Sequence, residues 1–173
     1  MRTTTLSAVL LCGLLAPALA ACGSDDPKAA ESSAPTTTEA DALTVTDPWV
    51  KAADSGMTAA FGTLVNDSDE EIDVVKAATS VNAMTELHET VENADGSMAM
   101  RPKEGGFTIP AGGEHELAPG GDHIMLMELA KPVAAGTTVT LTLTLGDGST
   151  KKLEATVKPF DGGDEKYQSG GPS

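Results

Sequence analysis

Two short clusters of histidine and methionine are the residues whose types and spacing suggest metal chemistry. His123, Met125 and Met127 are separated from one another by single apolar residues, and Met98 and Met100 are separated by one alanine. In a β-strand, alternate side chains point to the same face. Each cluster therefore presents its nitrogen or sulfur atoms together on one side of a strand.

A second histidine extends this pattern. His88 lies in the segment 84–90, where strand alternation directs Leu87 to the core and His88 to the opposite face. Glu86 shares the face of His88 and is a candidate partner that would orient its imidazole. The third histidine, His115, follows a turn and is flanked by acids, so we expect a solvated strand residue rather than a ligand.

The methionines decide which metal such residues would hold. Thioethers are soft, neutral ligands that suit Cu(I), whereas imidazole serves many metals. Two imidazoles and two thioethers bind a monovalent ion without burying anionic ligands. Because histidine binds metal in its neutral form, affinity should fall as the pH drops through the imidazole range. We expect a site near the surface, with exposed thioethers that a recipient protein's ligands replace stepwise.

Methionine also fills irregular gaps in protein cores, so packing is the alternative explanation. The chain has seven methionines beside one Trp, one Tyr and three Phe. Six methionines follow Met1, and four of them belong to the two clusters. From the residues alone, metal binding and packing both remain open.

The elements that must position these residues are β-strands. Short segments rich in β-branched and alternating residues recur along the chain, separated by turn signals such as Asp95-Gly96. No comparable window shows a helical apolar period. We therefore expect two packed antiparallel sheets, with strands at 43–50, 58–65, 72–77, 84–91, 98–101, 107–109, 115–117, 123–129, 137–145 and 152–157.

The N-terminal segment is typical of a bacterial lipoprotein. A basic Arg2 and a short apolar run end at Leu19-Ala20-Ala21-Cys22, which predicts a signal peptide over 1–21 and lipidation of Cys22. Two acyl chains would anchor the protein stably to the membrane. Residues 22–42 and 160–173 lack the apolar side chains needed to fold, so we expect a disordered tether and a disordered tail around a single domain at 43–159.

Cysteine usage and charge exclude several functions. Cys12 leaves with the signal peptide and Cys22 is consumed by lipidation, so the folded domain cannot build a blue-copper, thiolate-zinc or iron–sulfur site. The formal net charge of −15 disfavours nucleic acid as a partner. No Ser/His/Asp set or phosphate loop supports an enzyme.

The ordered motifs of the domain resemble those of the PCu(A)C family of extracytoplasmic copper chaperones. The family motif is His, ten residues, Met, twenty-one residues, His-x-Met; here both gaps are one residue longer, with the extra residues expected in loops around 92–97 and 103–108. The resemblance covers roughly residues 46–158 and is carried by Glu86-Leu87-His88-Glu89-Thr90, Met98-Ala99-Met100-Arg101-Pro102, Ile109-Pro110-Ala111-Gly112-Gly113 and Leu117-Ala118-Pro119-Gly120-Gly121-Asp122-His123-Ile124-Met125-Leu126-Met127.

The resemblance implies an all-β, cupredoxin-like or Ig-like Greek-key β-sandwich that carries Cu(I) on the extracytoplasmic face of the membrane. It implies delivery to the copper centre of cytochrome c oxidase, often alongside a Sco-type partner. The alternatives are copper storage or resistance without delivery, and a metal-free Ig-like interaction module. The implied ligands are His88, Met100, His123 and Met125, with Met98 and Met127 as substitutes.

Overall fold

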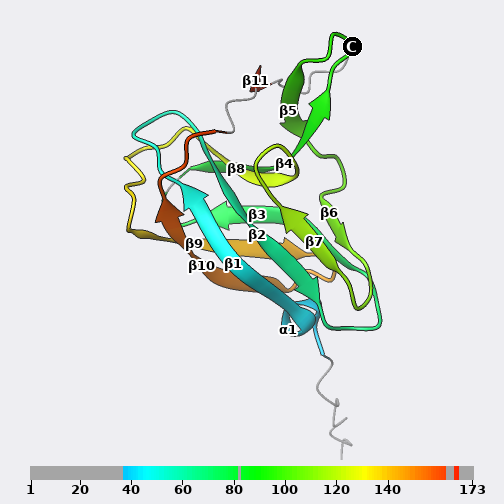
Figure 1. The fold of residues 1–173 in the computed structure, drawn as a ribbon. Helices are drawn as coiled ribbons and strands as arrows, with labels where there is room; N and C mark the ends of the chain where they lie inside the picture. Colours follow the sequence, from blue (N-terminus) through cyan, green and yellow to red (C-terminus); the bar gives the residue numbers. More distant parts are fainter. Residues whose placement is uncertain (1–36, 82, 163–165, 168–173) are drawn as a thin grey trace, which may run out of the picture. The chain divides into compact units, whose positions relative to one another are not determined.

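A computed structural model describes residues 37–81, 83–162 and 166–167 (Figure 1). Their regular secondary structure is nearly all β-strand, as the sequence predicts. Among them, no helix is both long and apolar enough to cross a membrane. The elements, in chain order, are α1 (Glu39–Ala42), β1 (Leu43–Lys51), β2 (Thr58–Asn66), β3 (Ile72–Thr79), β4 (Met84–Glu92), β5 (Met98–Pro102), β6 (Phe107–Ile109), β7 (Glu114–Leu117), β8 (His123–Met127), β9 (Thr138–Leu145), β10 (Thr150–Lys158) and β11 (Lys166–Tyr167).

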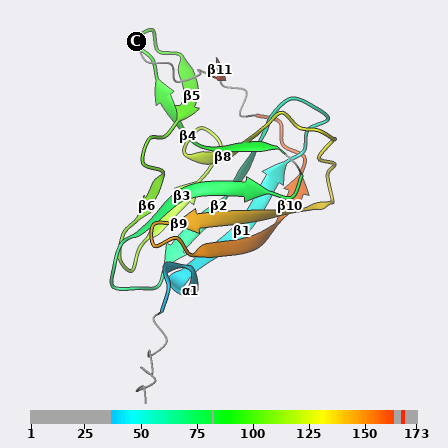
Figure 2. The same cartoon turned by 180° about the vertical axis from the view of Figure 1, so that it is seen from behind.

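The described strands form one hydrogen-bonded sheet that folds over on itself. Its strand order is β11-β5-β4-β8-β2-β1-β10-β9-β3-β6, and β7 pairs with β2 beside this path. The β1–β10 and β5–β11 pairs are parallel, and the other pairs are antiparallel. Strands β3 and β4 are distant in this order yet lie against each other. The result is the predicted β-sandwich (Figures 1 and 2).

Alternation along the strands fills the space between the two layers. In β9, Val139, Leu141, Leu143 and Leu145 are buried, and the threonines between them are more exposed, as the sequence predicts. Aliphatic residues and Phe107 make up the main core, and none of its buried members among the described residues is a methionine. The methionines therefore do not serve as filler in the main core.

Two short elements lie outside the expected domain limits of 43–159. In α1, the backbone N–H and hydroxyl of Thr38 both donate to Asp41, which lowers the pKa of that carboxyl. The backbone N–H of Glu39 also donates to Asp147, at 3.0 Å. Strand β11, which lies inside the expected tail, pairs with β5. Both segments are ordered by hydrogen bonds to the domain, and composition alone does not reveal such bonds. The predicted signal peptide and Cys22 lie outside the described residues.

Candidate metal centre

The register of three neighbouring strands gathers the predicted residues on one face of the sheet. His88 of β4 lies directly opposite His123 of β8. Across β4 and β5, Thr90 lies opposite Met100. Directly opposite residues share a face, and so do residues two apart on one strand. His88, Met100 and His123 therefore face the same way, and Met125 joins them from β8.

The two histidines form the buried centre of this face. Their ring centroids are 5.5 Å apart, with an interplanar angle of 61°. His88 is 0% exposed and His123 is 4% exposed. The nearby Phe61 ring, 6.2 Å from that of His123, extends the apolar surroundings on the side of β2. Two imidazoles from strands far apart in sequence thus meet in a place largely shielded from water.

Three methionines pack together beside the histidines. Met100, Met125 and Met127 form a buried cluster against Ala59 of β2 and are 6%, 3% and 6% exposed. Met98, on the same face of β5, is 44% exposed. The expectation of exposed thioethers is therefore wrong for Met100 and Met125, because the neighbouring strand and the other thioethers cover them. Of the two β5 methionines, Met100 is the one that contacts Met125.

A pocket gives these buried atoms a route to the surface. It has a volume of about 300 Å³ and is lined by residues of several loops and strands. His123, Met100 and Met125 line it, whereas His88 is fully buried and is not among the lining residues. The remaining lining residues are Lys51, Ala53, Met57, Thr58, Ala59, Phe61, Pro119 and Gly120.

Hydrogen bonds fix the orientation of both imidazoles. The Nε2 atom of His88 lies 2.8 Å from Oε2 of Glu86, the partner suggested by the sequence, and a carboxylate there accepts the Nε2–H. Nδ1 of His123 lies 3.0 Å from the carbonyl oxygen of Gly121, which can only accept. These bonds favour tautomers with the lone pair on Nδ1 of His88 and on Nε2 of His123. Hydrogen-bond partners of this kind orient metal-binding histidines.

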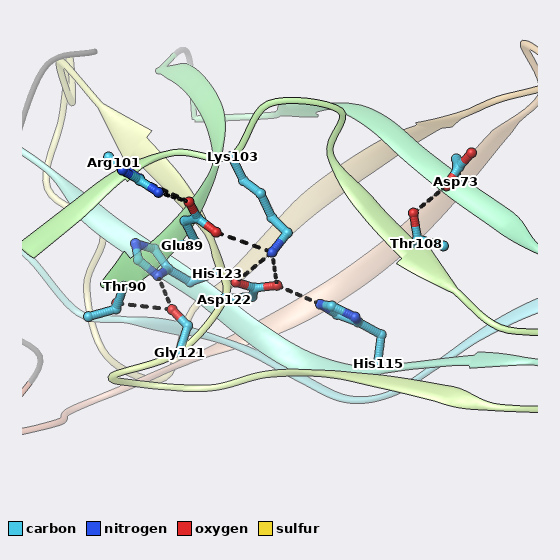
Figure 3. Close-up of polar contacts among 10 residues, drawn as sticks. All are labelled: Asp73, Glu89, Thr90, Arg101, Lys103, Thr108, His115, Gly121, Asp122 and His123. Atoms are coloured by element: carbon cyan, nitrogen blue, oxygen red, sulfur yellow. Dashed lines mark hydrogen bonds and ion pairs between the residues drawn. The ribbon is translucent and has the colours of Figure 1, made fainter. Parts of the chain in front are cut away.

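A chain of charged residues ties the ligand-bearing strands together on the other face (Figure 3). Arg101 donates to Glu89 at 2.9 Å, and Lys103 lies 3.4 Å from Glu89 and 3.1 Å from Asp122. The hydrogen bond from Arg101, followed by that from Lys103, lowers the pKa of the Glu89 carboxyl. Burial opposes the charge on Lys103, but its bonds to Asp122 and Glu89 prevail and raise its pKa. Asp122 immediately precedes His123, so this chain of charged residues extends to the candidate metal centre.

His115 belongs to this chain of charges, so its expected position as a solvated residue is wrong. Its Nε2 lies 2.9 Å from Asp122, and its ring stacks on Phe107 with centroids 5.3 Å apart. The side chain is only 21% exposed. Because Asp122 and Phe107 come from other parts of the chain, the flanking acids of His115 could not indicate this environment.

The lowered pKa of Glu89 predicts a pH-dependent contribution to stability. A carboxyl with a lower pKa in the folded state stabilises the fold above its unfolded pKa, near 4.5, and loses that effect as the pH falls through the folded value. At pH 7, Glu89→Gln should lower the free energy of unfolding by up to about 1 kcal/mol. Urea titrations at pH 7 and pH 3 measure this, and the difference should be smaller at pH 3. Glu116→Gln, an exposed acid of β7, is the control, and an equal loss in that variant would contradict the assignment.

The sequence did not single out three further residues of this face. Met57 and Phe61 line the pocket from the start of β2, and Met84 lies opposite Met127 on β4. Single residues outside the two clusters give no chemical signal of their own. Strand alternation already places Met84 on the face of His88, whereas only the pairing of β2 with β8 shows that Met57 and Phe61 share that face.

The donor set on this face fits a soft monovalent cation. It offers two imidazole nitrogens and thioether sulfurs, which are nearly buried and bind metal without adding negative charge. Among residues 37–81, 83–162 and 166–167, no three His, Cys, Asp or Glu side chains are grouped as ligands for a harder metal. Thioethers select Cu(I) over such metals.

Solved structures with this fold define the class of protein. The copper-bound PCuAC domain from PmoF2 matches with a TM-score of 0.57 at 18% identity, over 69% of this chain and 94% of that domain, which shows a shared fold. Apo-DR1885 from Deinococcus radiodurans is 35% identical over 86% of this chain and 97% of its own, with a TM-score of 0.54. The Cu(I) form of DR1885 is 38% identical over 72% and 85%, with a TM-score of 0.51. The fold is that of PCuAC-type β-sandwich domains.

The particular family follows from the sequence comparisons. The family model "Putative lipoprotein LpqE-like" matches residues 43–157. A curated relative, "Putative lipoprotein Lxx21020" from Leifsonia xyli subsp. xyli (strain CTCB07), is 42% identical over 168 residues, which is 97% of this chain and 95% of the relative. The chain belongs to the LpqE-like family.

Proposed function

We propose that this protein is an extracytoplasmic Cu(I) chaperone that binds one ion through His88, Met100, His123 and Met125. The observation that carries the proposal is the meeting of two imidazoles and two thioethers from three strands on one buried face beside a pocket. The relationship to DR1885, whose structure is known with Cu(I), supports the choice of metal. A metal-free interaction module would not need this convergence of neutral donors.

Delivery rather than permanent binding is supported by the position of the donors. His123, Met100 and Met125 line the pocket, so the ligands of a recipient protein have a route to the metal. His88, which is fully buried, binds the metal from the protein interior. We propose lipidation of Cys22 and anchoring at the extracytoplasmic face of the membrane, which the lipoprotein family supports. Cytochrome c oxidase or a Sco-type protein is the recipient that the PCu(A)C resemblance implies.

A matched pair of variants tests the ligand set. Met100→Leu should weaken Cu(I) binding by about ten- to a hundredfold, because the buried thioether is replaced by an alkyl group of similar volume. Met98→Leu, the same change two residues away at an exposed position, should leave the affinity of this site within about twofold. Competition with a chromophoric Cu(I) chelator measures both. A loss confined to Met98→Leu would assign the sulfur ligand to Met98 instead.

A transfer experiment separates chaperone from storage protein. The Cu(I)-loaded protein is mixed with the apo copper domain of a cytochrome c oxidase, and the metal is followed between the two. A chaperone should transfer its ion faster than it releases the ion to a chelator alone, because the recipient's ligands enter through the pocket. Transfer no faster than spontaneous release would favour storage.

A further inference from the structure

The methionines of the described residues are all found on one face. The six that follow Met1 are Met57, Met84, Met98, Met100, Met125 and Met127. Register and pocket lining place each of them on the face of the sheet that carries His88 and His123. Met100 and Met125 belong to the proposed copper site. Three of the other four are about half exposed: Met57 at 46%, Met84 at 50% and Met98 at 44%.

A row across the sheet contains Met84 of β4, Met127 of β8 and Met57, which immediately precedes β2. Met84 lies directly opposite Met127 in the β4–β8 pair. On the other side of β8, Thr58 pairs with Leu126, so the preceding Met57 lies beside Met127. The N–H of Leu129 donates to the carbonyl of Gly56 at 3.0 Å, so the two segments stay together past Met57, with the register moved by one residue near Glu128.

The spacing of the row suits ligation of one ion. Side chains directly opposite across a strand pair have Cβ atoms about 4.5–5.5 Å apart, and methionine has three rotatable bonds with which to bring its sulfur to a shared point. Met127 is 6% exposed and lies between two half-exposed methionines. An apolar side chain half in water is an unfavourable choice for packing, whereas a thioether at the surface is accessible to a soft ion.

We propose that Met57, Met84 and Met127 form a second, weaker Cu(I) site of thioethers alone, through which copper reaches the His88–His123 site. Met127 belongs to the same buried cluster as Met100 and Met125, so the two sites are contiguous. An ion taken up at the exposed row needs to move only from Met127 to Met125 to reach the imidazoles. A site without imidazole binds Cu(I) less tightly, which directs the ion inward.

Titration of Cu(I) into the protein labelled with ¹³C at the methionine methyl groups tests this second site. The first equivalent should shift the methyl signals of Met100 and Met125, and the second should shift those of Met57, Met84 and Met127. In a Met57→Leu/Met84→Leu variant, the second equivalent should no longer bind and the Met127 signal should stay unshifted. Both residues are half exposed, so leucine there should not disturb the fold.

Met98→Leu is the matched control. Met98 pairs with Glu92, at the opposite end of β4 from Met84, so it lies about 26 Å along the strand from the row. This variant should keep both equivalents. The second site is refuted if Met57 and Met84 signals do not move at two equivalents, or if the double variant still binds both ions. It is equally refuted if Met98→Leu loses the second ion, since binding would then not be specific to the row.

The inward transfer of copper rests on the proposed function. The same titration tests the row of thioethers separately from the proposed His/Met site. A His123→Ala variant removes a ligand of the inner site but none of the row. Shifts of Met57, Met84 and Met127 should persist in that variant. Persistent row shifts together with unchanged inner binding would refute the His/Met site while leaving the thioether site intact.

Discussion

Replacing His123 by alanine should weaken Cu(I) binding by at least about 100-fold. Changes to groups that only orient a ligand typically cost about 10–100-fold in metal affinity, so loss of a ligand itself should cost more. His123 lines the pocket, is 4% exposed and has its Nδ1–H held by Gly121, so its other nitrogen is set to bind metal. Competition against a chromophoric Cu(I) chelator measures the loss directly.

His115→Ala is the matched control for this prediction. It removes an identical side chain that also makes a hydrogen bond through one ring nitrogen, but His115 stacks on Phe107 and is not among the residues lining the pocket. Its effect on Cu(I) affinity should not exceed the lower end of the range for an orienting group, about tenfold. Equal losses in the two variants would show that histidine number, and not the position of His123, determines copper binding.

The strands of this protein could be predicted closely because the signal is local. In β9, threonines alternate with Val139, Leu141, Leu143 and Leu145, and the buried face follows at once from period 2. The same rule placed the side chains of His88 and Leu87 on opposite faces of β4. Alternation depends only on the residues of one strand, so the faces were correct before the partners of any strand were known.

The partners of each strand were not predictable, because pairing is a long-range property. Nothing in the sequence near Met57 indicates that β2 lies beside β8, so its place in the row of thioethers could not be foreseen. His115 looked solvated because its partners, Phe107 and Asp122, are brought to it by β6 and the turn before β8. The family resemblance supplied what local pattern could not: that His88 and His123 meet.

The turn between β5 and β6 attaches the Met100 strand to the main core, and two adjacent glycines make it a sensitive point. Gly105 and Gly106 both have positive φ, +84° and +81°. A Cβ on Gly105 would meet nothing within 4 Å, whereas a Cβ on Gly106 would lie 2.0 Å from the backbone carbonyl oxygen of Val74. That oxygen belongs to β3, which pairs with β6, so it cannot move without disturbing the sheet.

Gly106→Ala should therefore lower the free energy of unfolding by at least about 2 kcal/mol more than Gly105→Ala. Both variants incur the cost of about 1–2 kcal/mol for an L-residue at positive φ, and both lose the same unfolded-state entropy, so their difference isolates the close contact with β3. Urea unfolding midpoints of the two variants measure that difference. Equal midpoints would mean that the turn accommodates the added methyl group without strain and does not fix β5 against the core. In that case the buried position of Met100 would depend on its own packing with Met125 and Met127, and not on the turn that follows its strand.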